Sequence, residues 1–260
     1  MKGRSFLVLL VVLSLGMVLS GPARGEMYVE GYLGGSFAAN APDQISGTWS
    51  RVGAAGVQTL EFPGHIDPAF QGGLKVGTWF VPEGFLGYNY PAWMKYLGFY
   101  LDFSYHRLNF GRQHGTNIVP GVANFTDSFF SEGQAATLAF MFAFRYGFLP
   151  DEEVPFGRLQ PYLAVGPAIF FSSQRPLLYS AVPWSYEADS DSSVNVALAL
   201  EAGLRWMALK NVSLDASFKY RYVCPGYHYT GFDRDGMLMD LNFNPTLNLF
   251  SFQVGAAYHF

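Results

Sequence analysis

Apolar and polar residues alternate through the segment from Leu247 to Phe260. The apolar set is Phe250, Phe252, Val254, Ala256, Tyr258 and Phe260. Because a β-strand sends alternate side chains to opposite faces, the pattern predicts a strand with one apolar face and one small or polar face. A strand that crosses a membrane needs about 9–11 residues, with aromatic residues near both interfaces. This segment fits that description.

The same alternation recurs earlier in the chain. We predict strands at about 27–38, 68–80, 97–108, 134–146, 159–172, 194–206, 212–223 and 247–260. The 159–172 segment fits least well, because Pro161 and Pro167 interrupt it and both of its faces are apolar.

Long and short connections alternate between these strands. The long ones are 39–67, 110–133, 173–193 and 224–246. Membrane barrels have short turns at one end and long loops at the other, so the sequence predicts an all-β, closed antiparallel transmembrane barrel of eight strands with four long extracellular loops. Ten strands remain an alternative if the pieces at 52–62 or 235–243 also cross the membrane.

Composition favours the same architecture. Aromatic residues make up 18% of the chain and charged residues only 14%, whereas globular domains carry about 25% charged residues. Beyond the N-terminal region no apolar run is long enough for a transmembrane helix. A closed barrel is the remaining way to place an apolar surface in lipid, because lipid cannot satisfy open backbone edges.

The N-terminus has the features of an export signal. Lys2 and Arg4 precede an apolar run from Phe6 to Leu19, and Ala23 and Gly25 supply small residues for a signal peptidase. We expect residues 1–25 to be a signal peptide for Sec-type export and residues 26–260 to be an outer-membrane barrel domain.

Charge and cysteine content exclude several functions. Removing residues 1–25 leaves 13 of the 16 basic residues against 20 acidic ones, a net charge of −7. An acidic chain without a basic run is not expected to bind nucleic acid. Cys224 is the single cysteine and the histidines are scattered, so we expect no metal site and no other cofactor.

Nine charged residues are predicted to face the barrel interior: Glu30, Lys75, Asp102, Arg145, Glu201, Arg205, Asp215, Lys219 and Arg221. Charges inside a narrow barrel are costly unless they are paired. A tight turn centred on Lys210 would set Glu201 opposite Lys219 and Arg205 opposite Asp215. We interpret the set as an ion-pair network that plugs the interior; a gated, ion-selective pore is the alternative.

Two further groups of residues could carry chemistry. Asp102, Ser104 and His106 share the predicted interior face, but residues two apart on one strand face lie about 7 Å apart. That separation is long for a nucleophile and its base, so interior packing is the simpler interpretation. Arginines in the predicted outer loops (Arg51, Arg112, Arg175 and Arg234) could meet lipopolysaccharide phosphates, although loop arginines are usually only solvated.

The chain resembles small outer-membrane β-barrel proteins of the OmpA/OmpX and opacity-protein superfamily. The resemblance rests on the signal peptide, Tyr28–Gly35, Gln160–Gly166, the hairpin from Glu201 to Tyr222, and the closing Tyr258-His259-Phe260. It implies that Tyr258 and Phe260 form the signal read by the barrel assembly machinery. It also implies contact with outer-membrane lipid and lipopolysaccharide.

The superfamily has several functions, so the resemblance leaves the function open. We expect a monomeric, non-enzymatic barrel with a plugged interior and a structural or surface-interaction role, in which the loops hold any surface ligand. The alternatives are a narrow porin-like channel for small or apolar solutes, and a lipid-modifying enzyme that uses an interior histidine.

Overall fold

A computed structural model of the protein describes residues 26–39, 42–81, 90–180, 185–187, 189–232 and 236–260. The predicted signal peptide, residues 1–25, lies outside the described residues. Arg234 does as well.

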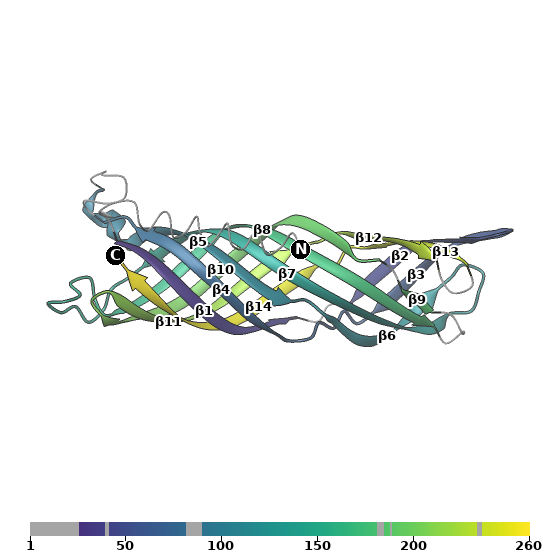
Figure 1. Ribbon diagram of the computed structural model, residues 1–260, viewed down its shortest axis with the longest axis horizontal. Coiled ribbons are helices and arrows are strands. Elements are labelled where there is room, and N and C mark those ends of the chain that lie inside the picture. The colour runs from purple at the N-terminus through teal and green to yellow at the C-terminus, as the bar shows by residue number, and fades with distance from the viewer. Residues whose placement is uncertain (1–25, 40–41, 82–89, 181–184, 188, 233–235) are drawn as a thin grey trace.

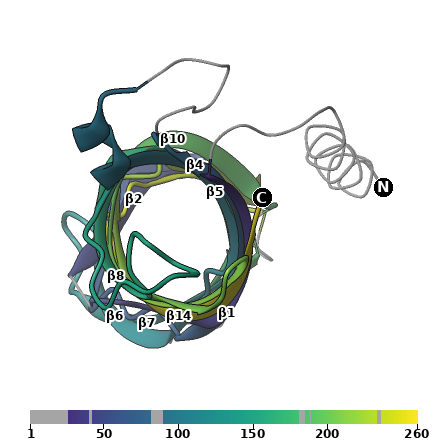
Figure 2. The ribbon, with the colours of Figure 1, turned by 90° about the vertical axis from the view of Figure 1, so that its left-hand side faces the viewer.

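Eight strands of the described chain pair in a closed antiparallel ring, as predicted (Figures 1 and 2). In ring order they are β1 (Glu26–Ala38), β4 (Ala69–Trp79), β5 (Leu97–Arg107), β7 (Phe125–Arg145), β8 (Leu159–Ser180), β10 (Asp191–Leu209), β11 (Val212–Val223) and β14 (Leu247–His259). The last strand, β14, pairs with β1 and closes the ring.

The alternating pattern explains which face of each strand points outward. On β14, Phe252, Val254 and Tyr258 are exposed on the outer wall, whereas Ser251 and Gln253 are buried inside. Phe250 and Tyr258 are eight residues apart, which is ~27 Å along a strand that rises ~3.4 Å per residue. A strand tilt of about 40° shortens this to ~20 Å along the barrel axis, close to the ~25 Å apolar band of membrane barrels.

Within the described residues, the segments predicted to be long loops contain six further β-strands, which corrects the sequence-based prediction. They carry β2 (Asp43–Arg51), β3 (Ala54–Phe62), β6 (Phe110–Ile118), β9 (Ser185–Glu187), β12 (Tyr227–Phe232) and β13 (Leu238–Phe243). With the upper parts of β7 and β8, these strands form a second tier, which we call the outer extension (Figure 1). The ten-strand alternative is wrong, because β3 and β13 pair within this tier and not in the ring.

Three ring strands are longer than predicted because they continue into the outer extension. β7 begins at Phe125 and not at 134, β8 continues to Ser180, and β10 begins at Asp191. Within the tier, β12 is joined to β10 by the backbone N–H of His228, which donates to Asp191 Oδ2 at 2.8 Å.

The prolines of the fifth predicted strand are accommodated locally. Pro167 lies on the outer face of β8. The β7–β8 ladder is interrupted here, between the pairs Ala139–Ala168 and Phe142–Val165, but the register is the same on both sides of the interruption. A Cβ atom on the neighbouring Gly166 would lie 1.9 Å from the Phe140 carbonyl oxygen, so the close approach of the two backbones requires glycine. The strand therefore continues through a proline that cannot donate a hydrogen bond.

The interior of the outer extension contains an apolar core, beside which the polar side chains of Gln58, Asn117 and Asp127 are buried. Four phenylalanines from four different strands meet in it, with ring centroids 4.6–5.9 Å apart: Phe62, Phe110, Phe129 and Phe243. Tyr227 stacks on Phe243 at 6.0 Å and on Tyr229 at 6.2 Å. Such packing orders the extension and fills its centre.

The end of the barrel that holds the C-terminus carries the β4–β5, β7–β8 and β10–β11 connections. A 3-10 helix, η2 (Ala92–Tyr96), lies on the outer wall there (Figure 2). No helix in the described part of the chain is long and apolar enough to cross a membrane.

Candidate functional site

The nine charged residues predicted to face the interior all lie inside the ring and are buried. None is more than 5% exposed, and Glu30 and Lys219 are fully buried. We call these nine residues, together with Glu26 described below, the charged network.

Glu201 on β10 is the centre of the charged network. Its Oε1 accepts hydrogen bonds from Lys75 Nζ at 2.7 Å and from the Tyr162 hydroxyl at 2.8 Å. Its Oε2 accepts one from the Tyr100 hydroxyl at 3.0 Å and lies 3.4 Å from Lys219 Nζ. These four partners compensate the burial of the carboxylate.

The predicted register of the β10–β11 hairpin is confirmed. Glu201 lies opposite Lys219 and Arg205 lies opposite Asp215. Arg205 also reaches across the interior to Glu30 on β1, with Nη2 2.8 Å from Glu30 Oε2. Lys75 lies 2.8 Å from the other oxygen of Glu30, so this carboxylate ties strands on opposite sides of the ring together.

Asp102 and Arg221 occupy the level nearer the outer extension. Asp102 accepts hydrogen bonds from the Tyr32 hydroxyl at 2.5 Å and from Lys219. Arg221 donates to Ser104 Oγ at 2.8 Å and to Gln71 Oε1 at 3.3 Å. No carboxylate of the described residues lies within ion-pair distance of Arg221, so its hydrogen bonds are to neutral groups.

Glu26 was missing from the predicted network. The carboxylate of Glu26 accepts hydrogen bonds from both terminal nitrogens of Arg145, with Nη1 2.6 Å from Glu26 Oε1. The Arg145 guanidinium also lies 4.1 Å from the centre of the Trp79 ring and 4.2 Å from that of Phe156. Glu26 was overlooked because it lies at the predicted cleavage site, although its even spacing from Tyr28 and Glu30 places it on the interior face. The network therefore has five acids and five bases.

The geometry gives no support to a nucleophilic triad. Asp102, Ser104 and His106 are all buried on the inner face of β5. However, Ser104 bonds to Arg221, and His106 Nδ1 lies 2.8 Å from the Arg107 carbonyl oxygen. Because Asp102 bonds to Tyr32 and Lys219, the three side chains engage other partners.

The β7–β8 turn lies across the opening at the C-terminal end when the barrel is viewed along its axis (Figure 2). Asp151 in this turn accepts hydrogen bonds from the backbone N–H of Val154 at 2.7 Å and of Glu153 at 3.0 Å, and from Arg158. The Val154 amide and the Arg158 side chain hold the pKa of Asp151 below its usual value. The turn is thus fixed by hydrogen bonds to a carboxylate.

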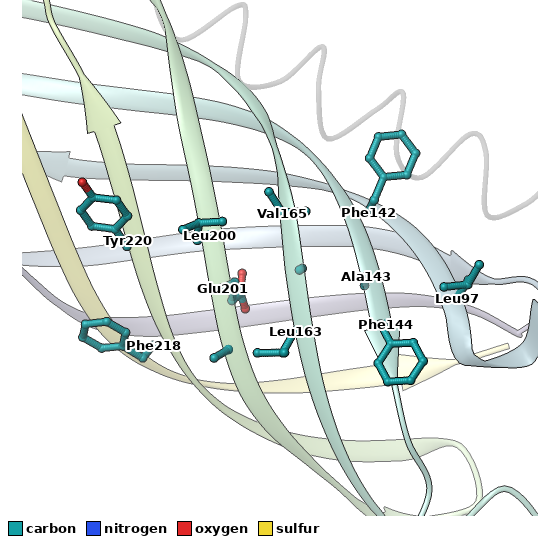
Figure 3. A pocket seen from close by; sticks show the side chains of 12 residues that line it. Leu97, Phe142, Ala143, Phe144, Leu163, Val165, Leu200, Glu201, Phe218 and Tyr220 are labelled. Atoms are coloured by element: carbon teal, nitrogen blue, oxygen red, sulfur yellow. The ribbon is translucent and has the colours of Figure 1, made fainter.

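Concave surfaces occur on the outer wall of the barrel. One is a furrow of about 680 Å³. Its lining side chains come from β5, β7, β8, β10 and β11, among them Phe142, Leu163 and Leu200 (Figure 3). Such furrows between rows of apolar side chains suit lipid acyl chains.

The C-terminal aromatics lie on the outer wall near the end of the barrel. Tyr258 is 50% exposed and Phe260 44% exposed. Their rings pack edge to face at 5.0 Å, and the Phe260 N–H donates to the Met27 carbonyl oxygen at 2.9 Å. These side chains are therefore open to lipid or to another protein.

A family model described as "Outer membrane protein beta-barrel domain" matches residues 10–260. A search of curated proteins gives no match.

Solved structures similar to this chain include three bacterial outer-membrane proteins. OprG from Pseudomonas aeruginosa is 14% identical with a TM-score of 0.46, covering 92% of this chain and 98% of OprG. Neisserial surface protein A is 12% identical with a TM-score of 0.37, covering 90% and 97%. Ail, the attachment invasion locus protein of Yersinia pestis, is 15% identical with a TM-score of 0.35, covering 92% and 100%.

Proposed function

The chain belongs to the outer-membrane β-barrel domain family, and we propose that it is a closed, non-enzymatic member whose interior is sealed and whose outer extension carries a structural or surface-interaction role. The protein is an outer-membrane barrel, so its wall contacts membrane lipid.

The observation that supports a sealed interior is the continuity of buried side chains along the barrel axis. The charged network fills the ring from Arg145 near the C-terminal end to Arg221 near the outer extension. The apolar core then fills the extension. Because cross-barrel ion pairs such as Arg205–Glu30 would have to break before an ion could pass, a permanent aqueous channel is disfavoured.

The outer extension supports a surface role because it is an ordered, exposed sheet. Val52, at the tip of the β2–β3 hairpin, is fully exposed, and the apolar core holds the other end of the hairpin through Ile45, Leu60 and Phe62. We propose that a surface ligand contacts this extension, that lipopolysaccharide contacts the wall, and that the barrel is a monomer.

Export and assembly complete the proposal. Residues 1–25 would direct Sec-type export and be removed, so that the mature chain begins at Glu26. Phe260 and Tyr258 would be recognised by the barrel assembly machinery. The intact mass of protein taken from the outer membrane tests the cleavage site, since a mature chain beginning elsewhere than Glu26 has a different mass.

A solute-flux experiment tests the sealed interior against the narrow-channel alternative. The refolded protein would be placed in phosphatidylcholine vesicles, and swelling in glycine, arabinose and an apolar solute followed by light scattering. We expect the same rate as in protein-free vesicles for each solute. Swelling that increases with the amount of inserted protein would favour the channel.

A further inference from the structure

Exposed basic residues are unevenly distributed around the outer half of the barrel. Among the described residues, those on the outside at this end are Arg51, Arg107, Arg112 and Arg175. Arg51 stands at the tip of the β2–β3 hairpin, but the other three lie on β5, β6 and β8, each of which pairs with β7. One wall of the barrel therefore carries three outward cations.

Two of these three arginines have no carboxylate partner. Arg175 lies opposite Glu132 across the β7–β8 ladder. For Arg107 and Arg112, no ion pair is found with any residue of the described chain. The Arg112 guanidinium lies 5.8 Å from the centre of the Tyr179 ring. Cations left without a carboxylate on a membrane protein's wall can bind an external anion.

Arg107 lies at the edge of a groove on the same wall. The groove has a volume of about 640 Å³ and lies between β4 and β5. Its lining includes Phe70, Gly72 and Tyr105, which give it an apolar floor, together with Arg107 and Asn109. The one acid in the lining, Asp67, lies 3.4 Å from His65 Nε2, and among the described residues no ion pair joins it to Arg107.

Two aromatic side chains, Phe70 and Tyr105, line the groove on the outer wall. Phe70, which is 71% exposed, pairs with β1 in the same ladder as Leu33, and Tyr105 is two residues before Arg107 on the outer face of β5. Aromatic girdles mark the interface between the apolar band and the headgroups. Below Tyr105 the outer face continues with the apolar Phe103 and Leu101. An occupant would thus have its polar part beside Arg107 and its apolar part against the barrel wall.

We propose that this groove binds a phosphate-bearing lipid of the outer leaflet, with Arg107 holding a phosphate and Phe70 and Tyr105 contacting the acyl region. Arginine suits this role, because its planar guanidinium donates two parallel hydrogen bonds to phosphate oxygens. Arg112, on the next strand segment, supplies a second cation for a lipid with a second phosphate. The inference rests on the proposed orientation, with the outer extension outside the cell, but not on whether the barrel conducts.

Lipid-dependent stability of the refolded protein tests the site. The protein would be inserted in phosphatidylcholine vesicles that contain bisphosphorylated lipid A or the same lipid with its phosphates removed, and the guanidinium midpoint of unfolding measured. We expect a higher midpoint with the phosphorylated lipid. Arg107→Gln should lose most of that increase, and Arg107→Gln/Arg112→Gln all of it. Arg107→Lys, which keeps the charge, should retain part.

Arg51→Gln is the matched control, because it removes an exposed cation far from the groove and should keep the full increase. An equal increase in the wild type and in Arg107→Gln/Arg112→Gln would overturn the proposal, as would equal loss in Arg51→Gln. A further arm adds inorganic phosphate to vesicles without lipid A. If phosphate alone produced the same increase, the site would bind the free anion and the lipid assignment would be wrong.

Discussion

Glu201 and Lys219 lie directly opposite each other on β10 and β11, and their side chains approach to 3.4 Å inside the barrel. Glu201 also bonds to Lys75 at 2.7 Å, so its carboxylate neutralises two buried lysines. Glu201→Gln removes a negative charge that lies beside both buried lysines. We expect the free energy of unfolding to fall by about 3–5 kcal/mol, measured by denaturant unfolding in vesicles.

The matched control for this substitution is Glu153→Gln. Glu153 also pairs with a base, at 2.8 Å from Arg158, but on the exposed β7–β8 turn. Exposed pairs contribute little, so this variant should unfold like the wild type. If Glu201→Gln were as stable as Glu153→Gln, Glu201 would not be the centre of the network.

Glu26 and Arg145 offer an independent test near the C-terminal end of the barrel. Arg145 is 1% exposed, and Glu26 is its one carboxylate partner among the described residues. Glu26→Gln should therefore lower the free energy of unfolding by about 1.5–3 kcal/mol. A double-mutant cycle with Arg145→Met checks the pair, because two coupled residues give non-additive losses. Additive losses would show that the two side chains act separately.

Deletion of Phe260 tests the proposed assembly signal. The shortened chain should still be exported, because residues 1–25 are unchanged, but less of it should insert in the outer membrane. The measurement is the amount of heat-modifiable protein in outer-membrane fractions. Phe148→Ala removes a similarly exposed aromatic, 48% against 44% for Phe260, and should insert normally. If the chain without Phe260 inserted normally, Phe260 would not be part of the assembly signal.

Trypsin added to intact cells tests the orientation. Arg51 is exposed at the β2–β3 turn of the outer extension, and Lys210 is exposed in the β10–β11 turn at the opposite end. We expect cleavage after Arg51 in intact cells and protection of Lys210 until the outer membrane is permeabilised. Arg51→Gln should abolish the fragment that this cleavage produces. Cleavage after Lys210 in intact cells, with Arg51 spared, would reverse the orientation.

The ring could be predicted from sequence because its two faces meet such different surroundings. Each outward position meets lipid and each inward position meets a polar interior, so the period of two is clear in strands such as β11. The β10–β11 register was predicted from a tight turn centred on Lys210. In the structure Leu209 lies opposite Val212, and a register shift between Met207 and Leu209 brings the rest of the hairpin into the predicted pairing. A tight turn fixes which residues oppose each other, so the pairing of Glu201 with Lys219 could be found without a structure.

The outer extension could not be predicted in the same way. Phe243 of β13 pairs with Ile45 of β2, which lies almost two hundred residues earlier in the chain, and no local pattern encodes that partner. Pro161 and Pro167 made the fifth strand the one that fits the strand pattern least well, since a missing N–H normally argues against a strand. Arg221 was expected to meet an acid, yet the structure gives it Ser104 and Gln71.

The sealed interior is tested most directly by the conductance of the refolded wild-type protein in planar phosphatidylcholine bilayers. Insertion would be verified by recovering protein from the bilayer-forming vesicles, and an open porin reconstituted in parallel would establish the sensitivity of the recording. Because the charged network and the apolar core fill the barrel in series, we expect no steady conductance above that of the bare bilayer. A stable open channel with a reproducible unitary conductance would contradict the sealed interior.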